Sequence, residues 1–187
     1  IYIGPKSGSS KKPSICSLLG MVLFSTFIFI GFWHIILLYL NQFLEIIINN
    51  RVIKHTGSKY PIIQAPMGWI ARSKLASAVC EAGGFGIIET SSGEIDNCKN
   101  EIKLMSKLTD KPFGVNLPLL FLKDDSMVKF CVSSGVKFVT TSAGDPTKYI
   151  KVLKDSGITV YHTVPNLEGA LKAAEAGVDG LVVEGTE

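Results

Sequence analysis

The sequence predicts an α/β protein with a parallel β-sheet, in which short buried strands alternate with amphipathic helices. Short apolar runs rich in Val, Ile and Phe recur along residues 60–187, which is typical of strands buried on both faces. Stretches that begin with helix-capping residues separate these runs. The turn glycines Gly135, Gly157 and Gly177 follow one another at spacings of 22 and 20 residues, which suits one strand plus one helix.

Six apolar runs are the expected strands. They are Ile62–Ala65, Phe85–Ile88, Phe113–Leu117, Val136–Thr140, Ile158–Tyr161 and Leu181–Val183. A doubly wound sheet can end after six strands, whereas a (β/α)8 barrel needs eight strands and about 250 residues. The strand pattern therefore leaves both architectures open, the second as a barrel that stops after its sixth strand.

The segments between the strands are the expected helices, and each contains a residue that suits a helix N-terminus. Ser73, Asp96, Asp125 and Asn166 are candidate N-caps, because their side-chain oxygens accept hydrogen bonds from free backbone N–H groups. Pro146 suits a first helical turn, where the missing N–H is not needed. Together with the strands, these helices form successive βα units.

Residues 1–50 differ in composition from the rest of the chain. Between Lys12 and Glu45 there is no Asp, Glu, Lys or Arg, and residues 17–40 are apolar on every helical face. About 20 such residues cross a membrane as a helix, so one interpretation is a transmembrane helix over 17–40 that gives membrane association. The alternative is a translated non-coding sequence or a wrong gene model, since the chain begins at Ile1 rather than Met.

The remainder has the charge balance of an ordinary globular domain. The whole chain carries 19 Lys and Arg against 16 Asp and Glu, and its net charge of +3 is too small for a nucleic-acid-binding protein. Residues 51–59 are polar and are expected to be a linker, so the predicted domain covers 60–187. We expect this domain to be cytoplasmic, with or without a membrane anchor.

The cysteines argue against a metal site or a disulfide framework. The four of them are far apart, without a C-x-x-C motif or a His at ligand spacing, and we expect buried thiols in a reducing compartment. They are Cys16, Cys80, Cys98 and Cys131.

The residues that follow the predicted strands suit a flat, partly polar ring. In both α/β architectures the ligand lies at the carboxyl ends of the strands. Small residues there let the backbone come close to a ring, Met packs against its face, and Asn binds an edge on which C=O and N–H groups alternate. The residues of these types are Ala65, Met67, Gly68, Asn116, Ser142, Ala143, Gly144 and Glu184.

Two common nucleotide motifs are absent from the sequence. There is no G-x-G-x-x-G after a strand and no G-x-x-x-x-G-K-[ST], which disfavours a Rossmann site and a P-loop. His162 follows the fifth predicted strand, and we expect it to pack against its surroundings rather than to act as a catalytic base.

Five segments of the sequence resemble the nitronate monooxygenase family, formerly called 2-nitropropane dioxygenase, to which the FMN-dependent enoyl-ACP reductases are related. The segments are YPIIQAPMGWIA (Tyr60–Ala71), EAGGFGII (Glu81–Ile88), PFGVNL (Pro112–Leu117), TTSAGDP (Thr140–Pro146) and EAGVDGLVVEGTE (Glu175–Glu187). The resemblance implies an incomplete (β/α)8 TIM barrel of about six βα units that binds FMN. It also implies a flavin-dependent oxidoreductase that oxidises alkyl nitronates with O2.

The resemblance also implies where FMN would bind. The isoalloxazine ring would lie against the turn Ala65, Pro66, Met67, Gly68, with Asn116 and the loop Ser142, Ala143, Gly144 nearby, and Glu184 and Gly185 would line the same pocket. In the family, the segment that matches E-G-T-E continues into A-G-G-H, whose His is catalytic. That His lies beyond Glu187, as do the loops that bind the phosphate, so no catalytic residue is assigned. We expect the chain as it stands to be inactive and a poor binder of FMN.

Two other functions stay open. One is an FMN-dependent enoyl-ACP reductase on the same barrel. The other is a membrane-anchored remnant of the barrel that has no catalytic activity. Nothing in residues 1–50 resembles the family.

Overall fold

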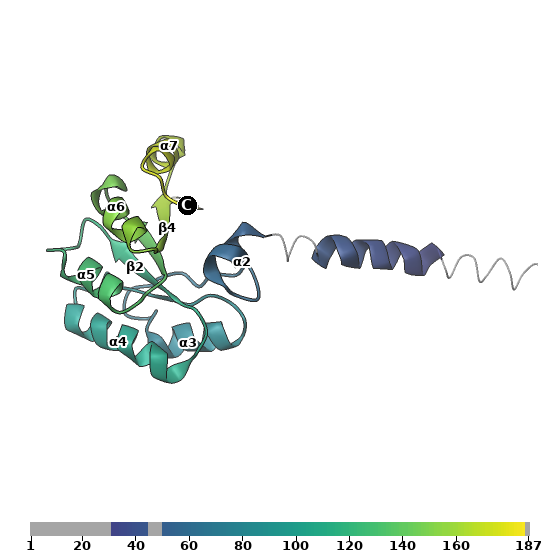
Figure 1. Ribbon diagram of the computed structural model, residues 1–187, viewed down its shortest axis with the longest axis horizontal. Coiled ribbons are helices and arrows are strands. Elements are labelled where there is room, and N and C mark those ends of the chain that lie inside the picture. Colours follow the sequence, from purple (N-terminus) through teal and green to yellow (C-terminus); the bar gives the residue numbers. More distant parts are fainter. Residues whose placement is uncertain (1–30, 45–49, 186–187) are drawn as a thin grey trace, which may run out of the picture. The chain divides into compact units, whose positions relative to one another are not determined.

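The computed structural model describes residues 31–44 and 50–185 of the chain. The chain divides into two compact units, Ile1–Ile46 and Ile47–Glu187. Figure 1 shows the helix of the first unit and the sheet and helices of the second.

In the first unit, residues 31–44 form a helix whose large apolar side chains are mostly exposed, among them Phe32, Trp33 and Leu38. The predicted transmembrane helix over 17–40 falls largely outside the described residues. Within residues 31–44 and 50–185, no helix is both long and apolar enough for a membrane crossing. The described part of the chain therefore gives no support to a transmembrane helix.

The second unit contains one parallel sheet of five strands, which confirms the predicted α/β fold (Figure 1). The strands are β1 (Ile87–Ile88), β2 (Gly114–Pro118), β3 (Phe138–Ser142), β4 (Thr159–Val164) and β5 (Gly180–Val183). The helices are α2 (Arg51–Thr56), α3 (Ser73–Glu81), α4 (Ile95–Leu108), α5 (Ser126–Ser133), α6 (Thr147–Asp155) and α7 (Leu167–Glu175). Each strand pairs with the strand that precedes it in sequence, whereas a doubly wound sheet reverses its strand order at one point.

Only part of the first predicted strand, Ile62–Ala65, pairs with the sheet. Ile63 forms an isolated parallel bridge with Phe85. Beyond it the side-chain amide of Gln64 donates to the carbonyl oxygen of Ile87 (3.2 Å) and accepts from its N–H (3.3 Å). The side chain of Gln64 thus takes bonds that a regular strand would make with its backbone, and the ladder stops.

The segment predicted as a linker, 51–59, contains helix α2. The Asn50 side chain caps this helix by accepting from the N–H of Val52 at 2.8 Å, and Gly57 ends it in the left-handed conformation. Polar composition alone does not reveal this helix, because its stability depends on these two caps and on contacts with the sheet.

Two of the predicted helix starts are confirmed and three are displaced. Asn166 caps α7 by accepting from the N–H of Gly169 at 2.9 Å, and Asp125 occupies the N-cap of α5 without a side-chain capping bond. Ser73 and Asp96 lie inside the first turns of α3 and α4, and Pro146 is the N-cap of α6 rather than a first-turn residue. Each displacement is one or two residues, the usual uncertainty of a helix end.

Helices α3 to α6 pack against one face of the sheet and form the main apolar core with strand residues such as Val115, Val139 and Val160. Cys80, Cys98 and Cys131 are buried free thiols, as predicted, while Cys16 lies outside the described residues. Burial raises the pKa of the Cys131 thiol to about 12, so this thiol is not reactive at neutral pH.

The other face of the sheet has two layers of side chains. Nearer the amino ends of the strands is an apolar layer of Phe85, Ile87, Phe138 and Tyr161. Side chains alternate between the faces of a strand, so residues two or four positions further along share this face nearer the carboxyl ends. They form a polar layer of Glu89, Asn116, Thr140 and Ser142, all buried except Ser142, which is half-buried.

Candidate functional site

Asn116 stands at the centre of the polar layer and links two strands. It pairs with Thr140 in the register of β2 and β3. Its Oδ1 atom accepts from the Thr140 hydroxyl at 2.9 Å, and its Nδ2 atom makes a longer contact of 3.4 Å with the Ser142 hydroxyl. These bonds fix the orientation of the amide, and one of the two hydrogens on Nδ2 has no partner among these contacts.

The loop after β3 lies against the loop after β2. The N–H groups of Leu119 and Leu120 donate to the carbonyl oxygens of Ser142 and Ala143, both at 2.8 Å. A Cβ atom added to Gly144 would lie 2.7 Å from the Cβ of Leu119, so only glycine fits this approach. The structure therefore brings Ser142, Ala143 and Gly144 to the same edge as Asn116.

The predicted turn of Ala65, Pro66, Met67 and Gly68 precedes α3. It is closed by hydrogen bonds from the N–H groups of Ile70 and Ala71 to the carbonyl oxygen of Met67 (3.2 and 2.8 Å). The Met67 side chain is 40% exposed, and the next residues, Trp69 and Ile70, are 68% and 62% exposed. Such exposure of large apolar side chains next to a polar layer suits the binding of a flat apolar ring.

Glu184 and Gly185 follow β5 at the same carboxyl edge. The N–H of Glu184 donates to the carbonyl oxygen of Val164 at 3.1 Å, and its side chain is exposed. Among the described residues, no hydrogen bond joins this side chain to the other candidates. The two residues share the edge of the sheet with Asn116 but not its hydrogen-bond network.

Sequence reasoning did not identify Glu89, which is a fully buried carboxylate at the end of β1. Its Oε1 atom accepts from the N–H of Trp69 at 3.2 Å and lies 2.8 Å from Nη2 of Arg72. Its Oε2 atom accepts from the N–H groups of Ser91 (2.7 Å) and Ser92 (3.0 Å). The only signal in the sequence is a charged residue directly after the apolar run that forms β1.

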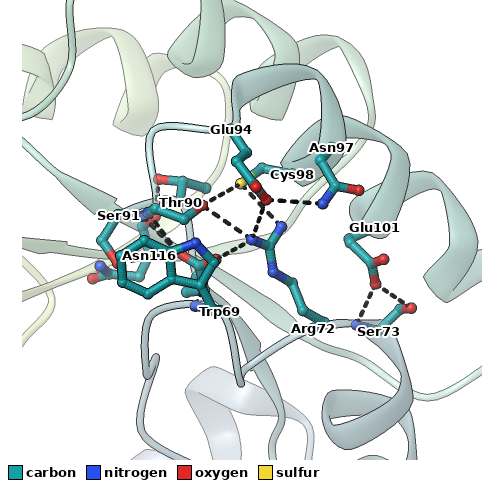
Figure 2. Close-up of polar contacts among 12 residues, drawn as sticks. Trp69, Arg72, Ser73, Thr90, Ser91, Glu94, Asn97, Cys98, Glu101 and Asn116 are labelled. Atoms are coloured by element: carbon teal, nitrogen blue, oxygen red, sulfur yellow. Dashed lines mark hydrogen bonds and ion pairs between the residues drawn. The ribbon is translucent and has the colours of Figure 1, made fainter.

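The surroundings of Glu89 keep it ionised. Burial alone would raise the pKa of this carboxyl, but hydrogen bonds from Ser92 and Ser91 and the charge of Arg72 outweigh burial and lower it. Arg72 also contacts the exposed Glu94 at 3.0 Å (Figure 2). The guanidinium thus lies between two carboxylates, one buried and one exposed.

Two neighbouring residues, Glu89 and Thr90, connect the turn before α3 to Asn116. Glu89 binds the turn through Trp69, and the hydroxyl of Thr90, the next residue, donates to the carbonyl oxygen of Asn116 at 2.6 Å. Trp69 (φ 57°) and Ala143 (φ 48°) are the non-glycine residues with left-handed backbones among those described. Such a conformation costs about 1–3 kcal/mol and clusters at functional sites.

His162 does not belong to this site. It lies beside Thr141 in the register of β3 and β4, on the face covered by helices, and its Nδ1 atom is 2.7 Å from the Thr141 hydroxyl. Burial is the main cause that lowers its pKa, so the ring is neutral at neutral pH. The expectation that His162 is a packing residue fits this position.

A cavity of about 310 Å³ lies near the amino ends of β1 and β2, away from the candidate site. It is lined by residues that precede β1 and β2, including Gly83, Gly84 and Pro112, and by none of the predicted site residues. Within residues 31–44 and 50–185, no group of three His, Cys, Asp or Glu side chains is placed to hold a metal ion.

Similar proteins point to one family. The sequence model of the nitronate monooxygenase family matches residues 49–130. A Mycobacterium tuberculosis protein named "(3aS,4S,5R,7aS)-5-hydroxy-7a-methyl-1-oxo-octahydro-1H-indene-4-carboxyl-CoA dehydrogenase" is 31% identical over 131 residues, which cover 70% of this chain and 37% of that protein. The nitronate monooxygenase of Paraburkholderia phytofirmans is 28% identical, and the match covers 70% of this chain and 46% of the relative.

Two solved structures are similar to this chain in both fold and sequence. FabK from Thermotoga maritima is 39% identical with a TM-score of 0.69, and the match covers 72% of this chain and 43% of FabK. Nitroalkane oxidase from Streptomyces ansochromogenes is 25% identical with a TM-score of 0.61, and the match covers 71% of this chain and 48% of that one. The chain thus spans less than half the length of these proteins. The α/β unit of this chain belongs to the nitronate monooxygenase family.

Proposed function

We propose that this α/β unit is part of a flavin-dependent oxidoreductase that binds FMN at the carboxyl edge of its sheet and oxidises alkyl nitronates with O2. In this proposal the sheet is part of a (β/α)8 barrel. The sequential order of the five parallel strands, with helices α3 to α6 on one face, supports that architecture. Membership of the nitronate monooxygenase family supports the reaction.

The donor set at the edge fits a flavin. The ring edge of FMN alternates C=O and N–H groups, and the Asn116 amide offers a donor and an acceptor in an orientation fixed by Thr140. The exposed Met67 side chain offers a polarizable surface to the ring face. The network that joins Asn116 to the Met67 turn through Thr90 and Glu89 is the observation that carries the proposal.

Within the proposed reaction, the residues of this chain bind and orient. Met67 and Gly68 would hold one face of the ring, while Asn116 and the loop from Ser142 to Gly144 would hold its edge, with Glu184 and Gly185 further along the same edge. FMN, when bound, supplies the electron transfer between the nitronate and O2. The described residues thus provide position and electrostatics.

The test uses protein expressed from the complete natural transcript, sequenced through both ends. We expect bound FMN close to one per chain, and O2 consumption that depends on both FMN and propane-2-nitronate. Asn116→Leu is expected to weaken FMN binding, whereas Asn100→Leu, at an exposed position of α4, is expected to leave it unchanged. A protein that neither binds FMN nor consumes O2 with a nitronate would contradict the proposal.

A second candidate reaction acts on a thioester. The observation that favours it is the 31% identical relative, whose name specifies a carboxyl-CoA substrate. This candidate predicts NADH- or NADPH-dependent reduction of crotonyl-CoA by the FMN-loaded protein without net nitronate oxidation. Measuring both activities on one preparation distinguishes the two reactions.

A further inference from the structure

Glu89 is a buried carboxylate whose contacts all go to two segments, the turn before α3 and the loop after β1. Its side chain is 0% exposed. One oxygen binds the turn before α3, through the N–H of Trp69 and the Arg72 guanidinium. The other binds the loop after β1, through the N–H groups of Ser91 and Ser92 and the Ser91 hydroxyl at 3.0 Å. A buried carboxylate is costly unless it is paired, and here the pairing joins these loops.

The residue that Glu89 holds is exposed and has an unfavourable backbone conformation. Trp69 is 68% exposed, so its indole is not held by burial in a core. Its φ of 57° is a conformation that a large side chain rarely adopts. Gly68, just before it, packs close to the other loop, since an added Cβ would lie 3.3 Å from the Ser91 hydroxyl. The hydrogen bond to Glu89 and this close contact together define where Trp69 lies.

Arg72 contacts three further side chains besides Glu89. Its Nη2 atom donates to the Ser92 hydroxyl and to Glu94, both at 3.0 Å, and its Nη1 atom donates to the Cys98 sulfur at 3.5 Å. Figure 2 shows Arg72 between Trp69 on one side and the separate pair of Ser73 and Glu101 on the other. Arg72 thus ties the turn to α4 as well as to β1.

We infer that Glu89 is a positioning residue, which holds Trp69 and the Met67–Gly68 turn in place as one wall of the proposed FMN site. This inference rests on the proposed function for the identity of the ligand, but the ordering of the turn is measurable without FMN. Glu89 makes no contact with the ring in this inference and acts through the backbone of Trp69 and Ser91.

Trp69 itself provides a spectroscopic probe. The chain has two tryptophans, so in a Trp33→Phe background the fluorescence reports on Trp69 alone. Glu89→Gln replaces one acceptor oxygen by an NH2 group, which faces N–H donors that it cannot bind. In the absence of FMN, we expect the steady-state anisotropy of Trp69 to fall and the acrylamide quenching constant to rise about twofold. We also expect the Kd for FMN to rise at least tenfold.

A matched control is available at Glu101. Its carboxylate accepts from the N–H of Ser73 at 2.8 Å and from the Ser73 hydroxyl, so it makes the same kind of bonds outside the turn. Glu101→Gln is expected to keep the Trp69 anisotropy and the Kd for FMN within twofold of the parent. An equal change of Trp69 anisotropy in both variants would overturn the inference, because it would reflect a general loss of structure.

A second variant covers the case in which Glu89→Gln does not fold. Arg72→Gln removes the charge beside Glu89 but leaves the bonds from Trp69, Ser91 and Ser92, and we expect an intermediate fall in anisotropy. Unchanged anisotropy and an unchanged Kd in every folded variant would overturn the inference while leaving the proposed function intact. Ordering of Trp69 that depends on Glu89, in a protein that binds no FMN, would support positioning of the turn and contradict the proposed function.

Discussion

The two layers on the face of the sheet opposite helices α3 to α6 have different chemistry. The apolar layer near the amino ends is packed ring against ring, with the centroid of Phe138 at 4.9 Å from those of both Phe85 and Tyr161. The polar layer, a few ångströms further along the same strands, is joined by hydrogen bonds around Asn116 and Glu89. Trp69 and Ala143, the non-glycine residues with left-handed backbones among those described, lie beside the second layer.

This difference indicates a division of roles along the strands. The apolar layer contributes stability through burial, which does not depend on exact hydrogen-bond geometry. The polar layer retains strained backbone and buried polar groups, which cost free energy and are typical of ligand sites. Variants at the amino end should therefore change stability far more than FMN binding, and variants at the carboxyl end should do the reverse.

The largest expected effect is at the amino end. Phe138→Ala removes the ring that contacts both Phe85 and Tyr161, and a buried Phe→Ala change costs about 3–5 kcal/mol. Urea denaturation followed by circular dichroism measures this loss. Phe121→Ala is the matched control, because Phe121 is 66% exposed, and should change stability by about 0.5 kcal/mol or less. A loss below about 1 kcal/mol at Phe138 would show that this layer does not stabilise the fold.

The next effect is at the carboxyl end. Asn116→Leu keeps the side-chain volume but removes the acceptor for Thr140 and the donor proposed for FMN. We expect the Kd for FMN to rise about 10- to 100-fold, and the free energy of unfolding to fall by about 1–2 kcal/mol. Fluorescence titration of FMN measures the Kd. A large loss of stability with an unchanged Kd would reverse the assignment of roles to the two layers.

A smaller effect is expected where α2 meets the apolar layer. The Tyr161 hydroxyl lies 2.9 Å from Nδ1 of His55, and Tyr161→Phe should cost about 0.5–1.5 kcal/mol. It should also speed amide hydrogen exchange in α2. Tyr149→Phe, which removes a hydrogen bond to Asp125, is expected to cost a similar amount without changing exchange in α2. Equal exchange rates of α2 in both variants would show that the hydrogen bond between His55 and Tyr161 does not stabilise α2.

The sequence predicts the sheet better than it predicts the supports of the site. Alternating apolar runs identify β2 to β5 to within a few residues, because burial against helices requires a continuous apolar pattern. The early end of the first predicted strand is not visible in the apolar pattern. It depends on the Gln64 side chain, which bonds the backbone of Ile87 in place of the Gln64 backbone. Helix α2 has a weak local signal, an Asn before it and a Gly after it, which becomes clear only with both caps considered together.

The candidate site shows the same limit. Small residues, Met67 and Asn116 are recognisable because their chemistry suits a ring and they follow strands. Glu89 and Arg72 belong to no motif, and their importance depends on a salt bridge between residues 17 positions apart in the sequence, which only the fold brings together. Sequence reasoning therefore finds groups that face a ligand more readily than groups that hold them.

The smallest expected effect is a dependence of stability on pH that arises at the carboxyl end alone. Because the pKa of Glu89 is lowered in the fold, its ionised form contributes stability above the ordinary value of 4.5, and this contribution is lost as the pH falls through the lowered pKa. Urea denaturation between pH 7 and pH 3 should therefore show a steeper loss of stability for the parent protein than for Glu89→Gln. Tyr161→Phe, which changes the amino end, should keep the parent's slope below pH 4.5. If Glu89→Gln also keeps that slope, Arg72 and the loop N–H groups do not hold the buried carboxylate ionised. The ionised form of Glu89 would then contribute nothing to the stability of the polar layer.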